Sequence, residues 1–221
     1  MKGDVILVEE YHLEAAQKII QNILPEINDQ KRRFTISIAG ESGSGKSEMA
    51  RAVQIVLEKQ GVAAQILGQD DYFVLPPRSN DNKRREDPQW LGPHVEVKMD
   101  LLEKNIIDVI NGENKITKPL IDYQKNEILE ESVNFEGIKA LIIEGTYTSL
   151  LRNIDRRVFI ARNYQDTLKH RSKRNRGEEV GDPFVEGLLE TEHKIIAGHK
   201  QLANIIITKE YDVIFTELAA K

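Results

Sequence analysis

The chain has 221 residues, of which 40% are hydrophobic and 30% charged, and its formal net charge is −5. This length suits one α/β domain with a sizeable core, and the negative charge argues against nucleic acid or an anionic membrane as a partner. There is no cysteine, which excludes disulfides, thiolate metal sites and cysteine nucleophiles, and no apolar run approaches the about 20 residues of a membrane span. The N-terminus lacks a signal-peptide pattern, so we expect a cytoplasmic protein.

The first half of the chain alternates helical and strand patterns. In chain order these patterns predict a helix over residues 12–27, a strand over 34–39, a helix over 46–60 and a strand over 63–67. Pro25 should end or kink the first helix, because proline removes a backbone hydrogen bond and clashes with the preceding turn. Residues 70–99 combine prolines with mixed charges and are predicted to form a long irregular loop, a kind of segment that is usually functional.

The second half continues this alternation. It predicts a helix from an N-cap at Asp100 to Asn111, strands over 115–123, 141–143, 157–161 and 205–207, and helices over 164–176 and 184–202. The continuous apolar run over 141–143 is typical of a buried parallel strand. Strands that alternate with helices favour an α/β fold, with a mostly parallel sheet and helices on both faces.

A glycine-rich loop joins the strand over 34–39 to the next helix. Its residues are Gly40, Glu41, Ser42, Gly43, Ser44, Gly45, Lys46 and Ser47, which match the pattern G-x-x-x-x-G-K-S. The glycines let backbone N–H groups turn inward around phosphate oxygens, and the helix N-terminus adds its dipole. Lys46 would reach the β and γ phosphates, and the Ser47 hydroxyl would ligate Mg²⁺. Because a strand precedes the loop and a helix follows it, the context indicates a nucleoside triphosphate site.

Carboxylates follow two other predicted strands. Glu144 ends the apolar run over 141–143, where it would hold the metal or a metal-bound water; a surface glutamate is the alternative interpretation. Asp70 and Asp71 follow the strand over 63–67. Either would accept the proton of an attacking hydroxyl, unless both only stabilise a turn, and position alone does not choose between them.

The helix predicted over 164–176 is strongly basic. Arg171 and Arg174 are three residues apart and share a helical face, from which they would stabilise the charge of a transferring phosphoryl group. A basic helix of this kind would close over the phosphates as a lid. The alternative is a solvated basic face, or a local contact with RNA.

In this order, the motifs resemble those of the uridine kinase and phosphoribulokinase-like group of P-loop kinases, over roughly residues 34–212. The resemblance rests on Gln69-Asp70-Asp71-Tyr72-Phe73, Ile143-Glu144-Gly145, Arg171-Ser172-Lys173-Arg174-Asn175 and Leu202-Ala203-Asn204-Ile205. It implies a three-layer P-loop NTPase fold with a basic helical lid. We expect one kinase domain over 31–221, with the lid at about 164–183, an acceptor-side insert at about 70–125 and an N-terminal helical extension over 1–30.

The resemblance also implies an ATP- and Mg²⁺-dependent kinase that phosphorylates a hydroxyl group of a small molecule. It selects Asp70 over Asp71 as the base. The candidate catalytic residues are then Asp70, Lys46, Arg171 and Arg174, and the candidate metal-side residues are Ser47, Glu144 and Asp70. No nucleic acid and no membrane is expected as a partner, and a homo-oligomer is compatible with the family.

The acceptor stays open at this point. A nucleoside such as uridine or cytidine is favoured, and the candidate substrate contacts are Tyr72, His94, Asp122 and Tyr123. Gln124 and Lys125 follow Tyr123 where uridine kinases usually have histidine and arginine. An acceptor of the sugar phosphate, pantothenate or glycerate type is therefore an alternative, and a nucleotide-binding ATPase or switch without a small-molecule acceptor is another.

Overall fold

Six strands form the central sheet of the computed structural model, which describes residues 6–167 and 182–216. The strands are β1 (Phe34–Gly40), β2 (Ala64–Gly68), β5 (Ala140–Glu144), β6 (Arg156–Ile160), β7 (Ile205–Ile207) and β8 (Val213–Phe215). Their spatial order is β2-β5-β1-β6-β7-β8, and every neighbouring pair is parallel except β7 and β8. The predicted mostly parallel sheet is confirmed, and β8 is a strand that the sequence patterns did not predict.

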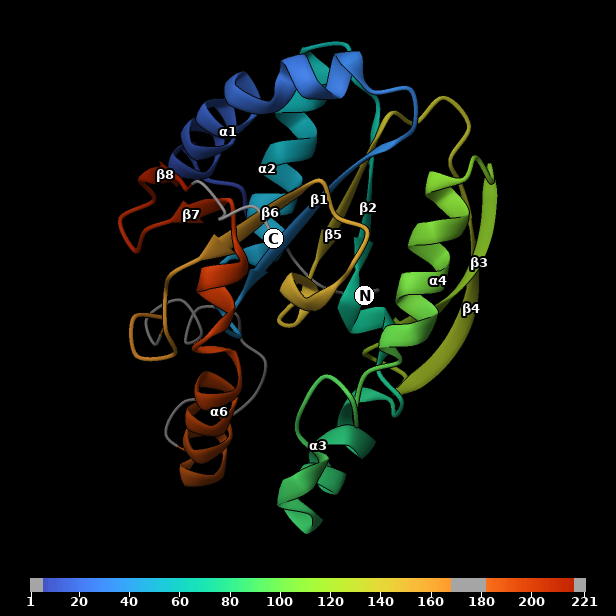
Figure 1. Ribbon diagram of the computed structural model, residues 1–221. Coiled ribbons are helices and arrows are strands. Elements are labelled where there is room, and N and C mark those ends of the chain that lie inside the picture. Colours follow the sequence, from blue (N-terminus) through green and yellow to red (C-terminus); the bar gives the residue numbers. More distant parts are fainter. Residues whose placement is uncertain (1–5, 168–181, 217–221) are drawn as a thin grey trace.

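Helices cover both faces of this sheet (Figure 1). The described α-helices are α1 (Glu10–Asp29), α2 (Lys46–Lys59), α3 (Pro77–Glu86), α4 (Met99–Ile110) and α6 (Pro183–Ile196). Of these, α1 and α2 pack on one face of the sheet and α4 on the other. Successive β1 residues point to opposite faces, so Ile38 packs in one core with α1 and α2 while Ala39 packs in a second core with α4. The three-layer α/β architecture is therefore confirmed. None of the described helices combines the length and the apolar character needed to cross a bilayer.

The segment over residues 1–30, predicted to be an extension, contributes α1, whose apolar face belongs to the main core. The helix continues through Pro25 to Asp29, so of the two predicted effects of proline, ending the helix is excluded. Pro25 is exposed, whereas Ile23 and Ile27 on either side are buried. The burial of those two side chains offsets the backbone hydrogen bond that proline cannot make.

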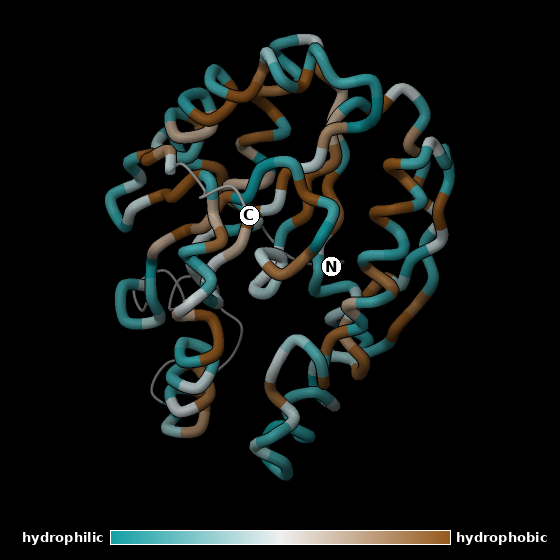
Figure 2. Tube along the Cα trace, in the orientation of Figure 1, coloured by the Kyte–Doolittle hydropathy of each residue, from teal (hydrophilic) through white to brown (hydrophobic). Residues whose placement is uncertain are grey.

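Residues 70–99 do not form the irregular loop that was predicted. They contain α3, with 3-10 turns at Gln69–Tyr72 and Pro88–Trp90 on either side. α3 starts with Pro77 in its first turn, a position that suits proline, and its other residues are all polar or charged. A helix without an apolar face lacks the periodicity by which helices are found in sequences, and α3 is correspondingly hydrophilic in Figure 2.

Two helix boundaries also differ from the prediction. α4 starts at Met99 and has Lys98 at its N-cap, so Asp100 lies in the first turn instead of capping it. α6 ends at Ile196, and the 3-10 turn His199–Leu202 follows as a separate element.

β3 (Lys115–Asp122) and β4 (Glu127–Asn134) form a separate antiparallel hairpin beside α4 (Figure 1). β3 confirms the strand predicted over 115–123, but β4 was not predicted. Its sequence, Glu-Ile-Leu-Glu-Glu-Ser-Val-Asn, is rich in residues that strands disfavour. Pairing with β3 along its whole length, not intrinsic preference, makes this segment a strand.

The basic helix predicted over 164–176 falls mostly on residues that are not described. Residues 164–167 form a turn, and Arg171 and Arg174 lie outside the described residues. The basic helical lid therefore stays a prediction.

Candidate active site

The order of the strands brings three strand ends together. β5 lies between β2 and β1, and its last residue, Glu144, pairs with Gly68 of β2 and Ile38 of β1. The loop after β1, the turn after β2 and the end of β5 therefore meet at one edge of the sheet, which is where open parallel sheets bind ligands. A cavity of about 250 Å³ lies at this edge and is lined by the glycine-rich loop, α3 and α6. Its size is close to that of small-molecule sites.

The backbone of the glycine-rich loop has the shape that its sequence predicts. Gly43 and Gly45 have φ angles of 78° and 98°, in a region that residues with a Cβ avoid. A Cβ on Gly45 would also lie 2.8 Å from the hydroxyl of Tyr211. The positive φ angles therefore favour glycine at both positions. At Gly45 a larger residue would also force the Tyr211 side chain to move.

Two polar side chains of the loop indicate an anionic ligand. Lys46 folds back over the loop, and its Nζ donates to the carbonyl oxygen of Glu41 at 2.9 Å. The hydroxyl of Ser44 is buried and has no hydrogen-bond partner among the described residues. A cation held over inward-facing donors is the arrangement that binds phosphate oxygens.

The predicted metal-side residues lie together along the cavity. The Ser47 hydroxyl donates to Glu144 Oε2 at 3.3 Å. Burial raises the pKa of Glu144 to about 7, and the negative charge of Asp70 adds to this effect while Lys46 opposes it. A hydroxyl and two mutually repelling carboxylates fit Mg²⁺, because this ion prefers oxygen ligands and would relieve the repulsion.

The raised pKa of Glu144 predicts how stability depends on pH. Its ordinary value is 4.5, so in metal-free protein the stabilising effect of its proton is present below about pH 4.5 and is lost as the pH rises to about 7. The free energy of unfolding should fall across this window, and Glu144→Gln should remove that part of the fall. Chemical denaturation of both proteins at several pH values measures the difference. If the free energy of unfolding depends on pH in the same way in both proteins, the raised pKa does not belong to Glu144.

The two neighbouring aspartates have different environments. Asp70 is half-buried and lines the cavity next to Glu144. Asp71 is buried elsewhere, with Oδ2 2.7 Å from the Nζ of Lys118 and Oδ1 accepting from a backbone N–H of β3 at 3.1 Å. Asp71 therefore fastens the hairpin to the sheet, and Asp70 is the aspartate that a substrate would meet.

Of the four predicted substrate contacts, only Tyr123 lines the cavity. Tyr72 is fully buried, its hydroxyl accepts from Asn105 at 2.9 Å, and burial raises its pKa to about 12. Asp122 is buried at the hairpin turn, where it accepts from a backbone N–H at 3.1 Å. His94 is exposed and does not line the cavity. The last three placements do not fit a direct contact with substrate.

The part of the cavity wall beside α3, which we propose as the acceptor side, is organised around Glu96, a residue that no sequence motif singled out. Its carboxylate is buried and accepts hydrogen bonds from Arg84 at 2.8 Å, Asn80 at 3.1 Å and Tyr147 at 3.3 Å. The backbone N–H of Gly92 adds a fourth at 3.1 Å. All these side chains line the cavity. The hydrogen-bond partners of Glu96 come from separate segments of the chain, so no local sequence motif indicates this network.

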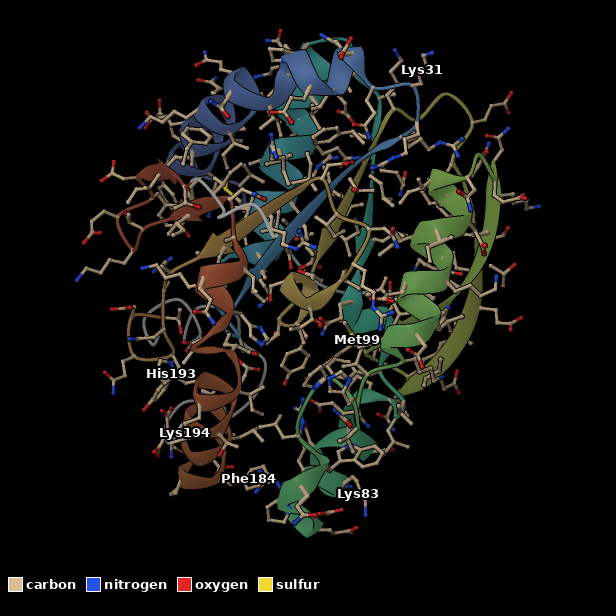
Figure 3. All side chains as sticks on the ribbon, in the orientation of Figure 1. Lys31, Lys83, Met99, Phe184, His193 and Lys194 are labelled. Atoms are coloured by element: carbon tan, nitrogen blue, oxygen red, sulfur yellow. The ribbon has the colours of Figure 1, made fainter. Side chains whose placement is uncertain are left out.

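α6 contacts the glycine-rich loop through two adjacent residues. Glu192 accepts from the backbone N–H of Ser42 at 2.7 Å and from its hydroxyl at 2.8 Å. His193, labelled in Figure 3, lies with Nδ1 2.6 Å from Oε1 of Glu41, and burial raises the pKa of Glu41. Glu41 also accepts from the backbone N–H of Tyr164 at 2.6 Å. Sequence reasoning missed these contacts because about 150 residues separate their members.

Sequence comparison shows which known proteins this chain is similar to. A model described as the "Phosphoribulokinase / Uridine kinase family" matches residues 35–168. The chain is 30% identical over 194 residues to the bifunctional alpha-galactosidase/sucrose kinase AgaSK of Mediterraneibacter gnavus, a match that covers 83% of this chain and 21% of that protein. It thus spans only about a fifth of this relative. It is also 30% identical over 183 residues to a uridine kinase of Staphylococcus epidermidis, covering 78% of this chain and 86% of that protein.

Solved structures resemble the fold. A putative fructose transport system kinase from Silicibacter sp. superposes with a TM-score of 0.62 at 18% identity, covering 85% of this chain and 93% of that one. A possible uridine kinase from Bacillus stearothermophilus gives a TM-score of 0.58 at 19% identity, with coverages of 82% and 94%. At such low identity these similarities concern the fold alone.

Proposed function

The chain belongs to the phosphoribulokinase/uridine kinase family and is a P-loop small-molecule kinase, and on this basis we propose that it transfers the γ-phosphoryl group of ATP, with Mg²⁺, to a hydroxyl group of a small acceptor. The observation that carries this proposal is the meeting of the loop over 40–47, Asp70 and Glu144 beside a single cavity that reaches α3 and α6. Donor and acceptor must share such a cavity, because phosphoryl transfer runs in line between them.

The donor side is assigned to the loop and its neighbours. Lys46 would bind the β and γ phosphates together with the backbone N–H groups of the loop. Ser47, Glu144 and Asp70 would hold Mg²⁺ directly or through its bound water. When bound, the metal neutralises negative charge on the phosphate oxygens.

Asp70 is the proposed base. It lies on the wall of the cavity that the glycine-rich loop also lines, so it would accept the proton of the acceptor hydroxyl as that oxygen attacks. Arg171 and Arg174 would stabilise the charge of the transferring group. These arginines lie outside the described residues, so their role rests on their spacing in a predicted basic helix and on the family resemblance.

A nucleoside such as uridine or cytidine is the first candidate acceptor. This choice is supported by the uridine kinases of Staphylococcus epidermidis and Ureaplasma urealyticum, which align over 86% and 94% of their own lengths at 30% and 27% identity. A free sugar is the second candidate. It is favoured by the match over 83% of this chain to a protein whose name includes a sucrose kinase.

An acceptor panel tests the proposal. Purified protein is incubated with Mg·ATP and, one at a time, with uridine, cytidine, other nucleosides, fructose and sucrose, and ADP formation is followed. At least one compound should stimulate ADP release strongly, and the Asp70→Asn variant should lose that stimulation. ADP release that is the same with and without every acceptor would contradict the proposal.

A further inference from the structure

Among the described residues, the cavity wall carries an excess of negative charge, and this excess restricts the kinds of acceptor that the proposed kinase would bind. The acidic side chains that line it are Asp70, Asp81, Glu96, Glu144 and Glu192, and the basic ones are Lys46, Arg84 and Arg85. Lys46 belongs to the glycine-rich loop and so to the donor side. The acceptor side is therefore served by two arginines among the described residues.

Both of these arginines are paired with carboxylates. Arg84 lies 2.7 Å from the buried carboxylate of Glu96 and 3.4 Å from Asp81. Arg85 lies 2.8 Å from Asp182 and stacks over the ring of Phe184 at 4.0 Å. Each arginine is thus offset by at least one carboxylate, so the described acceptor side has no net positive charge with which to attract a carboxylate or phosphate on the acceptor.

Glu192 adds a carboxylate to the cavity wall beside the glycine-rich loop. It is buried, with 7% of its surface exposed, and it is fixed by two hydrogen bonds from Ser42 of the glycine-rich loop. Its charge acts on both Arg84 and Tyr147 of the acceptor side. A carboxylate has about four acceptor positions, so the two hydrogen bonds from Ser42 leave others for a ligand.

The rest of the α6 wall is apolar. Phe184, Val185, Leu188 and Leu189 line the cavity at helical spacing and lead toward Glu192. Across from them, α3 contributes polar side chains, and Figure 3 shows Phe184 on the side of α6 that faces α3. One apolar wall and one polar wall suit a ring that has a C–H or aromatic face and a hydroxyl-bearing edge.

We propose that the acceptor is an uncharged, hydroxyl-rich molecule, a nucleoside or a free sugar, and that Glu192 selects it. Glu192 accepts hydrogen bonds from acceptor hydroxyls and repels analogues that carry a carboxylate or a phosphate. This inference rests on the proposed kinase function. It excludes acceptors of the sugar phosphate, pantothenate and glycerate type.

Matched acceptor pairs test the inference. ADP formation by the full chain with Mg·ATP is measured for uridine and orotidine, fructose and fructose 6-phosphate, glycerol and glycerate, and panthenol and pantothenate. For any pair that is used, kcat/KM of the neutral member should exceed that of the anionic member by about 100-fold or more. In Glu192→Gln this ratio should fall by about tenfold, because the repulsion is lost for both binding and turnover of the anion.

Glu190→Gln is the matched control. Glu190 lies on the solvent side of the same helix, pairs with Lys194 at 2.7 Å and does not line the cavity, so the same charge change there should leave the ratio unaltered. Taking a ratio cancels any change in ATP binding that the Ser42 contact causes.

Three results would overturn the inference, and they differ from one another. Equal or better use of anionic members by the unaltered protein would refute the neutral acceptor while leaving the kinase intact. A ratio that is the same in Glu192→Gln and the unaltered protein would remove Glu192 from selection. ADP release that no compound of either kind stimulates would remove the proposed function itself, and the inference with it.

Discussion

Asp70→Asn is expected to lower kcat by about 10²- to 10⁴-fold, the usual contribution of a general base, while ATP affinity changes little. The amide is almost the same size as the carboxylate but cannot accept the proton of the acceptor hydroxyl. Asp70 is half-buried on the cavity wall and contributes no hydrogen bond to the described fold that the substitution would break. Steady-state kinetics at saturating acceptor, with ATP binding measured separately, gives both quantities.

Asp71→Asn is the control for this prediction. The substitution is identical and one residue away, but Asp71 is held by Lys118 and lies outside the cavity lining. It should lower stability and leave kcat of the folded protein largely unchanged. If Asp70→Asn retains full turnover, or if both variants lose turnover equally, Asp70 is not the base.

Lys118→Met is expected to lower the free energy of unfolding by about 3–5 kcal/mol, the cost of removing one member of a buried ion pair. The side chains of Lys118 and Asp71 are each 5% exposed, and their charged atoms lie 2.7 Å apart. Removing the ammonium leaves the Asp71 carboxylate buried beside β3. Glu131, which is 3.0 Å from Lys118 Nζ and more exposed, can turn to solvent instead.

Two further variants make the stability measurement specific. Lys115→Met changes the same residue type at an exposed position of the same strand and should cost little. In the double variant Asp71→Asn with Lys118→Met, no charge is left stranded, so the loss should be smaller than the sum of the two single losses. Urea denaturation of the unaltered protein, the two single variants and the double variant measures this coupling. Additive losses would show that the pair contributes nothing beyond its separate side chains.

The sequence indicated which residues gather on the proposed donor side because their signals are local. The glycine-rich loop is a continuous motif whose flanking strand and helix are readable, and Asp70 and Glu144 each follow an apolar run. Open parallel sheets bind ligands at the carboxyl ends of their strands. Once the strands are known to be parallel, this rule places the loop, Asp70 and Glu144 at one edge of the sheet. The choice of Asp70 over Asp71 needed the family resemblance, and the buried position of Asp71 supports it.

The acceptor side could not be predicted in the same way. Glu96 matters because Arg84, Asn80 and Tyr147 converge on it in space, and Glu192 because α6 packs on Ser42. Nothing in the spacing of these residues indicates such contacts. Two elements, α3 and β4, were also missed. Both are rich in polar residues and lack the apolar periodicity by which secondary structure is recognised in a sequence.

The strand order has a consequence for how the protein is made. β1 and β2 follow each other closely in the sequence but never pair; each pairs with β5, which is inserted between them. On the ribosome, both early strands therefore wait with unpaired edges until residues 140–144 emerge, a condition that exposes a growing chain to aggregation and to chaperones. A chain arrested before β5 would carry every residue of the glycine-rich loop yet have no site in which to hold a nucleotide.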